Sequence, residues 1–496
     1  MKPGAPVEPV ESLTSRLGRW SAGRGPLYLL LAARLRQMIE DGLLRPGAAL
    51  PPDRTLATAL AVGRSTVVAA YETLRQEGKI TRRQGSGTRV AEAALSPVSN
   101  TPEKATGPTG VRDTSNPLFL HLLEPAHDII MLSCAAPAGP PPQLVDAYRS
   151  LAFPSDADLG YHPAGVPALR EEIAARFTAR GVATGPEHIL VTTGAQQALS
   201  LLTRHFVTPG DSVLVEAPTY AGALDVFREA AGVPLPVPAG ADGIDVTAAE
   251  RAMAAERPAL GYVISCFHNP TGGVLPPLAG RRLVEAARRY GVPLIDDEVL
   301  AELPLSGPAP RPLATFGDVI SIGSLSKLLW GGLRIGWVRG EAGLISRLSR
   351  LKALHDLGSD VPTQLAAVRL LTDLDELLST RRARLRTCHD HLRAELERLL
   401  PSWHCPPVPG GQTLWARLPH GDGTSFAQLA LRHGVAVLPG AALDITGHSN
   451  AYLRLHFLHE PAVLTQAVER LAHAWHAYRT APPQPRTGAA LNAIVV

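Results

Sequence analysis

The feature that most constrains the fold of this chain is a series of nearly continuous apolar runs separated by helical patterns. The runs cover residues 188–192, 212–215, 260–264 and 292–296, all within a long stretch from residue 118 to residue 480. Strands that are apolar at almost every position are typical of parallel sheets with both faces covered by helices. Ligands of such sheets bind at the carboxyl ends of the strands. The pattern therefore predicts an α/β domain over residues 118–480 whose mostly parallel sheet is flanked by helices.

Polar residues stand at the ends of these runs. Gly194 follows the first run and opens a helical pattern, so the backbone N–H groups there suit a phosphate. Tyr220, Asn269 and Asp297 follow the next three runs, where they could stack on a ring, donate to a phenolic oxygen and pair with a protonated pyridine nitrogen. Arg454 lies in a late apolar run and suits a carboxylate. Each signal is weak alone, because a lone tyrosine after a strand is more often core and glycine turns between strand and helix are common.

A lysine flanked by small hydroxyl residues strengthens these signals. Lys327 follows Ser324 and Ser326, and Arg334 comes seven positions after it. A lysine amine forms a Schiff base with the aldehyde of pyridoxal phosphate, while hydroxyl groups and a guanidinium hold the phosphate. The segment predicts a covalently bound pyridoxal phosphate.

Residues 20–91 predict a separate DNA-reading module. Apolar residues at helical spacing predict a first helix, a short second helix is expected with Asp53 as its N-cap, and a third covers residues 64–74. Residues 79–90 predict two short strands with a glycine-rich tip, so the module is a winged helix-turn-helix. Its third helix places its first residues, Arg64, Ser65 and Thr66, at base edges in the major groove. A small structural helical domain is the alternative, and the basic glycine-rich wing counts against it.

The charge distribution agrees with this division. The whole chain of 496 residues carries a formal net charge of +3, but its first 100 residues contain fourteen Lys and Arg against eight Asp and Glu, and so carry +6. The remaining residues are slightly acidic, at −3. A basic head on an acidic body favours nucleic-acid binding by the head alone, although a solvated basic face would give the same count.

The remaining segments indicate a linker, a tail and a compartment. Residues 92–117 are rich in Pro, Ser, Thr and Gly and predict a flexible linker, and residues 481–496 predict a disordered tail. No apolar run reaches the roughly 18 residues of a membrane span, and the N-terminus lacks the apolar core of a signal peptide. We therefore expect a cytoplasmic protein that makes no membrane contact. The four scattered cysteines, without a CxxC pair, argue against a metal site.

The head resembles the GntR-type winged-helix domain over residues 50–90, which read LPPDRTLATALAVGRSTVVAAYETLRQEGKITRRQGSGTRV. The resemblance implies double-stranded DNA as the partner. It implies DNA contacts from Arg54, Arg64, Ser65, Thr66 and, in the wing, Gly85.

The body resembles the fold type I aminotransferases that use pyridoxal phosphate. The resemblance rests on HNPTG at residues 268–272, on the spacing from Asn269 to Asp297 and on the SLSK segment with its later arginine. It implies a large domain with a smaller C-terminal α+β subdomain. It implies that Lys327 is the catalytic Schiff-base lysine, and that Asp297, rather than Asp296, holds the pyridine nitrogen. Asn269 would contact the ring oxygen, and Tyr220 would stack on the ring.

The same resemblance implies a phosphate site and a carboxylate site. The phosphate would be bound by Gly194, Ala195, Gln196, Ser324 and Arg334. Tyr161 would reach the phosphate of the partner subunit, and Arg454 would take the α-carboxylate of an effector or substrate.

One departure from the aminotransferase pattern bears on activity. The family usually has a tyrosine two or three residues after the pyridine aspartate, bonded to the cofactor's phenolic oxygen, whereas this chain has Val299 and Leu300. The missing phenol should raise the pKa of the Schiff base and leave Lys327 a poorer proton shuttle. The departure argues against an efficient transaminase, and it does not argue against cofactor binding.

A GntR-type head joined to an aminotransferase-like body resembles the MocR-type transcription regulators. This resemblance implies a homodimer that binds operator DNA through its heads and pyridoxal phosphate through its bodies. It implies a small-molecule effector, either an amino compound or pyridoxal phosphate itself. The alternative is a pyridoxal-phosphate-dependent aminotransferase of an amino acid or amine with an accessory DNA-binding head. Residual transaminase-type chemistry would be compatible with either interpretation.

Overall fold

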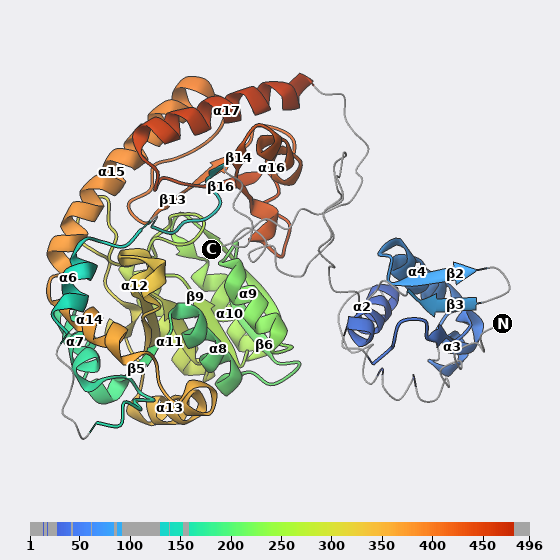
Figure 1. Ribbon diagram of the computed structural model, residues 1–496, viewed down its shortest axis with the longest axis horizontal. Coiled ribbons are helices and arrows are strands. Elements are labelled where there is room, and N and C mark those ends of the chain that lie inside the picture. The colour runs from blue at the N-terminus through green and yellow to red at the C-terminus, as the bar shows by residue number, and fades with distance from the viewer. Residues whose placement is uncertain are drawn as a thin grey trace. The chain divides into compact units, whose positions relative to one another are not determined.

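The computed structural model describes residues 13, 17, 27–40, 43–60, 62–83, 87–91, 129–137, 139–151 and 158–480 (Figure 1). These residues fall into two compact units, one on each side of residue 112. The predicted linker at 92–117, the predicted tail at 481–496 and Gly85 at the wing tip lie outside the described residues.

Over residues 27–91, the described part of the smaller unit has the helices α2 to α4 and a three-stranded antiparallel sheet. Its elements are α2 (Leu27–Glu40), β1 (Ala49–Leu50), α3 (Asp53–Ala59), α4 (Arg64–Gln76), β2 (Ile80–Arg83) and β3 (Gly87–Val90). The sheet has the order β1-β3-β2. Leu35 of α2, Leu56 of α3, Val67 and Leu74 of α4 and Ile80 of β2 are buried in one core. This arrangement confirms the predicted winged helix-turn-helix and adds β1, which the sequence did not predict.

The predicted capping role of Asp53 is wrong. The N-cap of α3 is Pro52, without a side-chain capping bond, and Asp53 is the first helical residue. The Asp53 carboxylate instead accepts a hydrogen bond from Arg64 Nε at 3.1 Å. A cationic partner from the next helix therefore holds this side chain.

The larger unit is built on an eight-stranded sheet. Its strand order is β5 (Ile189–Thr192), β12 (Gly336–Arg339), β11 (Ile320–Ser324), β10 (Leu294–Asp297), β9 (Leu260–Val263), β6 (Ser212–Ala217), β7 (Val233–Gly240) and β8 (Gly243–Ile244). The strands β5, β11, β10, β9, β6 and β7 run in one direction, and β12 and β8 run against them. The mostly parallel sheet predicted from the apolar runs is confirmed.

Helices cover both faces of this sheet (Figure 1). The helices of the unit are α6 (Gln143–Arg149), α7 (Pro167–Ala179), α8 (Ala195–Phe206), α9 (Ala221–Glu229), α10 (Val246–Glu256), α11 (Pro277–Tyr290), α12 (Leu325–Leu328), α13 (Ala342–Asp356), α14 (Val361–Thr372), α15 (Leu374–Leu399), α16 (Gly423–Arg432) and α17 (Pro461–Thr480). On β6, Val213 and Val215 pack with α8, α9 and α13, whereas Leu214 between them packs with α10 and α11. Because successive strand side chains point to opposite faces, two covered faces require apolar residues at successive positions.

The C-terminal part forms the smaller α+β subdomain. Its antiparallel sheet has the order β13 (Thr413–Arg417), β16 (Tyr452–His456) and β15 (Leu438–Pro439). A second pair joins β14 (Val435–Ala436) to β4 (Ile130–Met131). Helices α15 and α17 lie alongside each other over this subdomain (Figure 1). Within the part of the chain that the structure describes, no helix is long and apolar enough to cross a bilayer.

Candidate functional site

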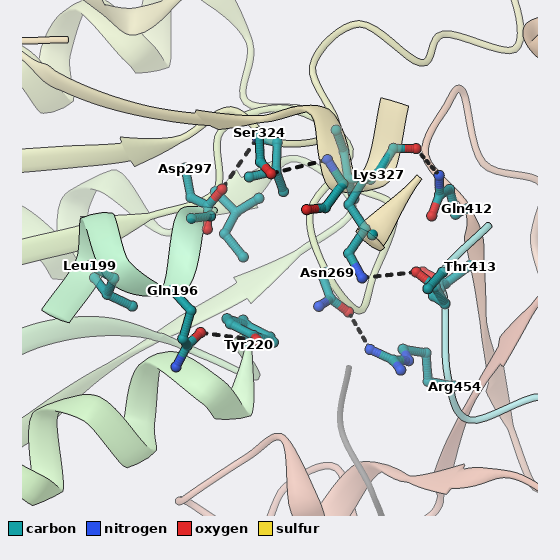
Figure 2. Close-up of a pocket in the computed structure, with 18 of the residues that line it drawn as sticks. Gln196, Leu199, Tyr220, Asn269, Asp297, Ser324, Lys327, Gln412, Thr413 and Arg454 are labelled. Atoms are coloured by element: carbon teal, nitrogen blue, oxygen red, sulfur yellow. Dashed lines mark hydrogen bonds between the residues drawn. The ribbon is translucent and has the colours of Figure 1, made fainter. Parts of the chain in front are cut away.

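A cavity of about 170 Å³ opens where the strands of the large sheet end and the C-terminal subdomain begins. Nine of the residues predicted to bind the cofactor or an effector line it: Ala195, Gln196, Tyr220, Asn269, Asp297, Ser324, Lys327, Arg334 and Arg454 (Figure 2). They come from segments up to 259 positions apart in the chain, between Ala195 and Arg454. The convergence follows from the parallel sheet, whose strand ends meet at one edge.

Lys327 lies in α12, the short helix that directly follows β11. Its Nζ donates a hydrogen bond to the backbone oxygen of Ala135 at 2.9 Å. Removal from water lowers the pKa of the amine to about 8. A larger fraction of the amine is therefore neutral near neutral pH, which is the state that can bond to a carbonyl carbon.

Asp297 ends β10 with both carboxylate oxygens engaged. Its Oδ2 accepts from the Tyr262 hydroxyl at 2.7 Å, and its Oδ1 accepts from the backbone N–H of Val299 at 3.2 Å. Burial raises the pKa of Asp297 to about 6, and the two hydrogen bonds oppose that rise. The group is a buried carboxylate that gains from a cationic partner in the cavity.

Helix α8 begins beside the Arg334 guanidinium and forms a cradle. Its N-cap, Gly194, has a φ of +104°, and a Cβ there would lie 2.7 Å from Arg334 Nη2. The N-cap makes no side-chain capping bond, so the first N–H groups of the helix have no side-chain acceptor there. Ser326 Oγ is buried and has no hydrogen-bond partner among the described residues, while Ser324 Oγ donates to the backbone oxygen of Ile335 at 3.0 Å. A helix N-terminus, a guanidinium and a free hydroxyl fit a phosphate-bearing ligand.

Arg454 reaches the cavity from β16 and is almost completely buried. Its Nη1 donates to Asn269 Oδ1 at 3.0 Å, and its Nη2 donates to the backbone oxygen of Ser133. Since the Asn269 oxygen is turned to Arg454, its amide N–H groups are the donors left for a ligand. Burial lowers the pKa of Arg454 to about 10, so the guanidinium is still charged at neutral pH.

Two tyrosines predicted for the site lie in different surroundings. Tyr220 precedes α9 and donates from its hydroxyl to Gln196 Oε1 at 3.2 Å, at the side of the cavity. Tyr161 is 67% exposed and does not line the cavity of its own chain. Val299 and Leu300, at the positions of the family's usual tyrosine, both line the cavity.

The sequence did not reveal several residues of the site. One is Tyr262, and two more bond to the backbone oxygen of Lys327: Gln412 Nε2 at 2.8 Å and Arg381 Nη2 at 3.1 Å. Gln412 directly precedes β13, and Arg381 lies on α15. The sequence signal that could have pointed to Gln412 was the glycine pair directly before it.

In the smaller unit, the first turn of α4 is open to solvent. Arg64 and Ser65 are exposed and Thr66 is half-buried, while Arg54 on α3 is exposed. Arg64 Nη2 lies 3.0 Å from Asp53 Oδ2, and Arg82 of β2 lies 4.0 Å from the same oxygen. Asp53 therefore lies close to two guanidinium groups, one from α4 and one from β2, on one side of the unit.

Known proteins share both parts of this architecture. The family model for class I and II aminotransferases matches residues 128–471, and the model for bacterial regulatory proteins of the gntR family matches residues 27–90.

Similar proteins include regulators and an aminotransferase. The uncharacterized HTH-type transcriptional regulator YdcR of Escherichia coli is 31% identical over 86% of this chain and 94% of its own length. The probable rhizopine catabolism regulatory protein MocR of Rhizobium meliloti is 30% identical over 63% of this chain and 65% of its own. Among solved structures, LysN, an α-aminoadipate aminotransferase from Thermus thermophilus, superposes with a TM-score of 0.67 at 30% identity, over 73% of this chain and 94% of its own.

The order of the two domains matches these regulators, and the larger domain has the fold of the aminotransferases. The chain therefore belongs to the MocR-type helix-turn-helix transcriptional regulators of the GntR family, in which a DNA-binding domain precedes an aminotransferase-like domain.

Proposed function

We propose that this chain is a cytoplasmic regulator that binds pyridoxal phosphate in the large-domain cavity. Its affinity for operator DNA changes when an effector enters that cavity. The observation that carries the proposal is the convergence of Lys327, Asp297 and the Gly194–Arg334 cradle on one cavity. Lys327 matches the aldehyde of this cofactor, Asp297 matches its ring nitrogen, and the cradle matches its phosphate. The similar LysN was crystallised with a phosphopyridoxyl amino acid, which supports the same ligand here.

Each residue has a part that its surroundings support. When bound, the cofactor supplies an aldehyde that bonds to amines and a ring that withdraws electrons. Lys327 supplies the amine, and Asp297 pairs with the ring nitrogen. The phosphate is bound by the N–H groups of Ala195 and Gln196 beyond Gly194, by Arg334 and by the two serines, Ser324 and Ser326. Tyr220 stacks on the ring, and Asn269 donates to the ring oxygen.

The effector is an amino compound with a carboxylate, or pyridoxal phosphate itself. Arg454 is a buried cation that lines the same cavity as Lys327, so a carboxylate bound to it would bring an amino group toward the lysine. A ligand shifts a two-state protein only by its difference in affinity for the two states. The proposal therefore requires that the interaction between the aminotransferase-like domain and the DNA-binding domains differs with and without the effector.

A homodimer is supported by an exposed apolar surface near the site. Leu159, Tyr161, Leu354 and Leu357 are between 56% and 86% exposed. They belong to one region, because Gly358 packs against the backbone of His162. Tyr161 does not line the cavity of its own chain. A second copy that covers this surface would bring its own cavity to Tyr161, so that the phenol binds the phosphate of that copy's cofactor.

The experiment that tests the proposal measures mass, DNA protection and turnover on the purified full chain. Sedimentation velocity is expected to give twice the monomer mass of 52.5 kDa. Footprinting on the DNA flanking its gene is expected to show a protected site that changes when amino compounds are added with pyridoxal phosphate. Steady turnover of an amino donor and a keto acceptor without any protected DNA would instead support the aminotransferase alternative.

Leu300 is one of the two hydrocarbon residues that stand where the family usually has a tyrosine, and replacing it tests the regulator against the enzyme. Leu300 is buried at the cavity wall, where the family's phenol would bond to the ring oxygen. We expect Leu300→Tyr to lower, by about one pH unit, the pH at which the cofactor-bonded Lys327 nitrogen loses its proton, and to raise transamination about tenfold. Absorbance titration and a coupled assay measure the two effects.

Leu300→Phe is the matched control, because it adds the ring without the hydroxyl. A tyrosine variant that titrates like the phenylalanine variant would show that the missing phenol does not limit the chemistry.

A further inference from the structure

We propose that Tyr262 is a positioning residue that holds the Asp297 carboxylate in place for a cationic ring nitrogen, and so sets how tightly the cavity binds pyridoxal phosphate. The inference rests on the proposed cofactor role of the cavity. It assigns a function to a residue that looks, in the sequence, like an ordinary member of an apolar strand.

The sheet brings the two side chains together. Strands β9 and β10 are parallel neighbours, with Tyr262 opposite Ile295 in the register. Asp297 is two residues further along β10, and the Tyr262 side chain reaches it, with 2.7 Å between its hydroxyl oxygen and Asp297 Oδ2. With Val299 N–H on the other oxygen at 3.2 Å, one donor holds each end of the carboxylate. The plane of the group is therefore fixed, and a carboxylate has about four acceptor sites, so it can still accept from a ring N–H.

Tyr262 acts from behind the cavity. It is completely buried, does not line the cavity, and packs edge-to-face on Phe227 with 5.8 Å between ring centroids. Its hydroxyl has no exposure to water, so the bond to the carboxylate is made in a dry environment, where charge-assisted hydrogen bonds are strong. Any effect of the phenol on a ligand must therefore pass through Asp297.

The charges around Asp297 give the direction of that effect. The titratable groups facing it are Tyr262 from β9, Lys327 from α12, Tyr220 at the start of α9 and the neighbouring Glu298. Burial raises the pKa of Asp297, and the bond from Tyr262 is the largest of the effects that lower it. Without the phenol, the pKa rises further, and less of the carboxylate is ionised to pair with a ring cation at neutral pH.

The test compares Tyr262→Phe with wild type for cofactor affinity, measured by the absorbance of bound pyridoxal phosphate. Loss of one hydrogen bond to a charged group is expected to weaken binding about tenfold. The loss is expected to be larger at pH 6 than at pH 8, because the carboxylate regains its charge as the pH rises. Tyr478→Phe is the matched control: its hydroxyl accepts from Asp422 N–H at 3.1 Å, in the C-terminal subdomain away from the cavity.

A double-mutant comparison separates positioning from general stability. In an Asp297→Asn background, Tyr262→Phe is expected to have no further effect on cofactor affinity, since the bond it removes served the carboxylate. An equal loss with and without Asp297, or no loss in the single variant, would overturn the inference. If Tyr262→Phe does not fold, Tyr262→His, which keeps a ring N–H donor, is expected to bind better than Tyr262→Leu.

The outcomes also distinguish this inference from the proposed function. A wild-type chain that never binds pyridoxal phosphate would remove both. A wild-type chain that binds it while Tyr262→Phe binds equally well would remove only the role of Tyr262.

Discussion

The Lys327→Ala variant is expected to lose all cofactor that borohydride can fix to the chain. The Lys327 amine lies at the cavity, and no other lysine among the described residues lines it. The measurement is the absorbance of the purified protein before and after borohydride, followed by mass spectrometry of its peptides. The chain has only five lysines, so a labelled peptide identifies its lysine directly.

The same variant is expected to stop responding to the effector while it still binds DNA. An effector that needs the Lys327 bond has no differential affinity once the amine is gone. Lys327→Arg is the matched variant, because it keeps the positive charge without an amine that can bond to an aldehyde. A variant of either kind whose DNA affinity still responds normally to added amino compounds would contradict the proposed mechanism.

Replacing Arg64 by alanine is expected to weaken operator binding by about 1–3 kcal/mol, if the guanidinium is bidentate to a guanine. Arg64 is exposed on the first turn of α4, and Asp53 holds it at 3.0–3.1 Å, so its guanidinium is pre-oriented. The measurement is a titration of the protected DNA site, together with the salt dependence of binding.

Arg75→Ala is the matched control for charge, since Arg75 is exposed in the last turn of α4 and paired with Glu72 at 2.6 Å. We expect it to leave site preference unchanged. Cofactor absorbance should be intact in both variants. An Arg64 variant that weakens specific and non-specific DNA equally would indicate a phosphate contact in place of a base contact.

Much of the fold was predictable because burial leaves a pattern in the sequence. The run at 212–215 reads as a strand covered on both faces, and β6 is one. In the head, helical spacing predicted α2 and α4, but a strand of two residues such as β1 is too short to carry a pattern. Asp53 was assigned as a cap because local preference favours it, and a tertiary partner, Arg64, prevailed.

The residues of the cavity, too, were predictable from the sequence only in part. Lys327, Asp297 and Asn269 follow strands and carry motifs, so the sequence brought them together as candidates, and the structure places them on one cavity. Gln412 and Arg381 are 85 and 54 positions from Lys327, and each bonds to its backbone oxygen. Every residue has a backbone oxygen, so the sequence at Lys327 does not indicate which side chains bond to that oxygen.

The two bonds on the Lys327 carbonyl have a mechanical consequence. Gln412 directly precedes the strand β13, which pairs with β16 so that Trp415 lies opposite Arg454. Arg454 and Gln412 are therefore connected through one small sheet. A ligand that displaces Arg454 also acts on the strand that follows the Gln412–Lys327 bond. The residue that would anchor the cofactor therefore also links the large sheet to the C-terminal part through its backbone oxygen, alongside the bond between Arg454 and Asn269.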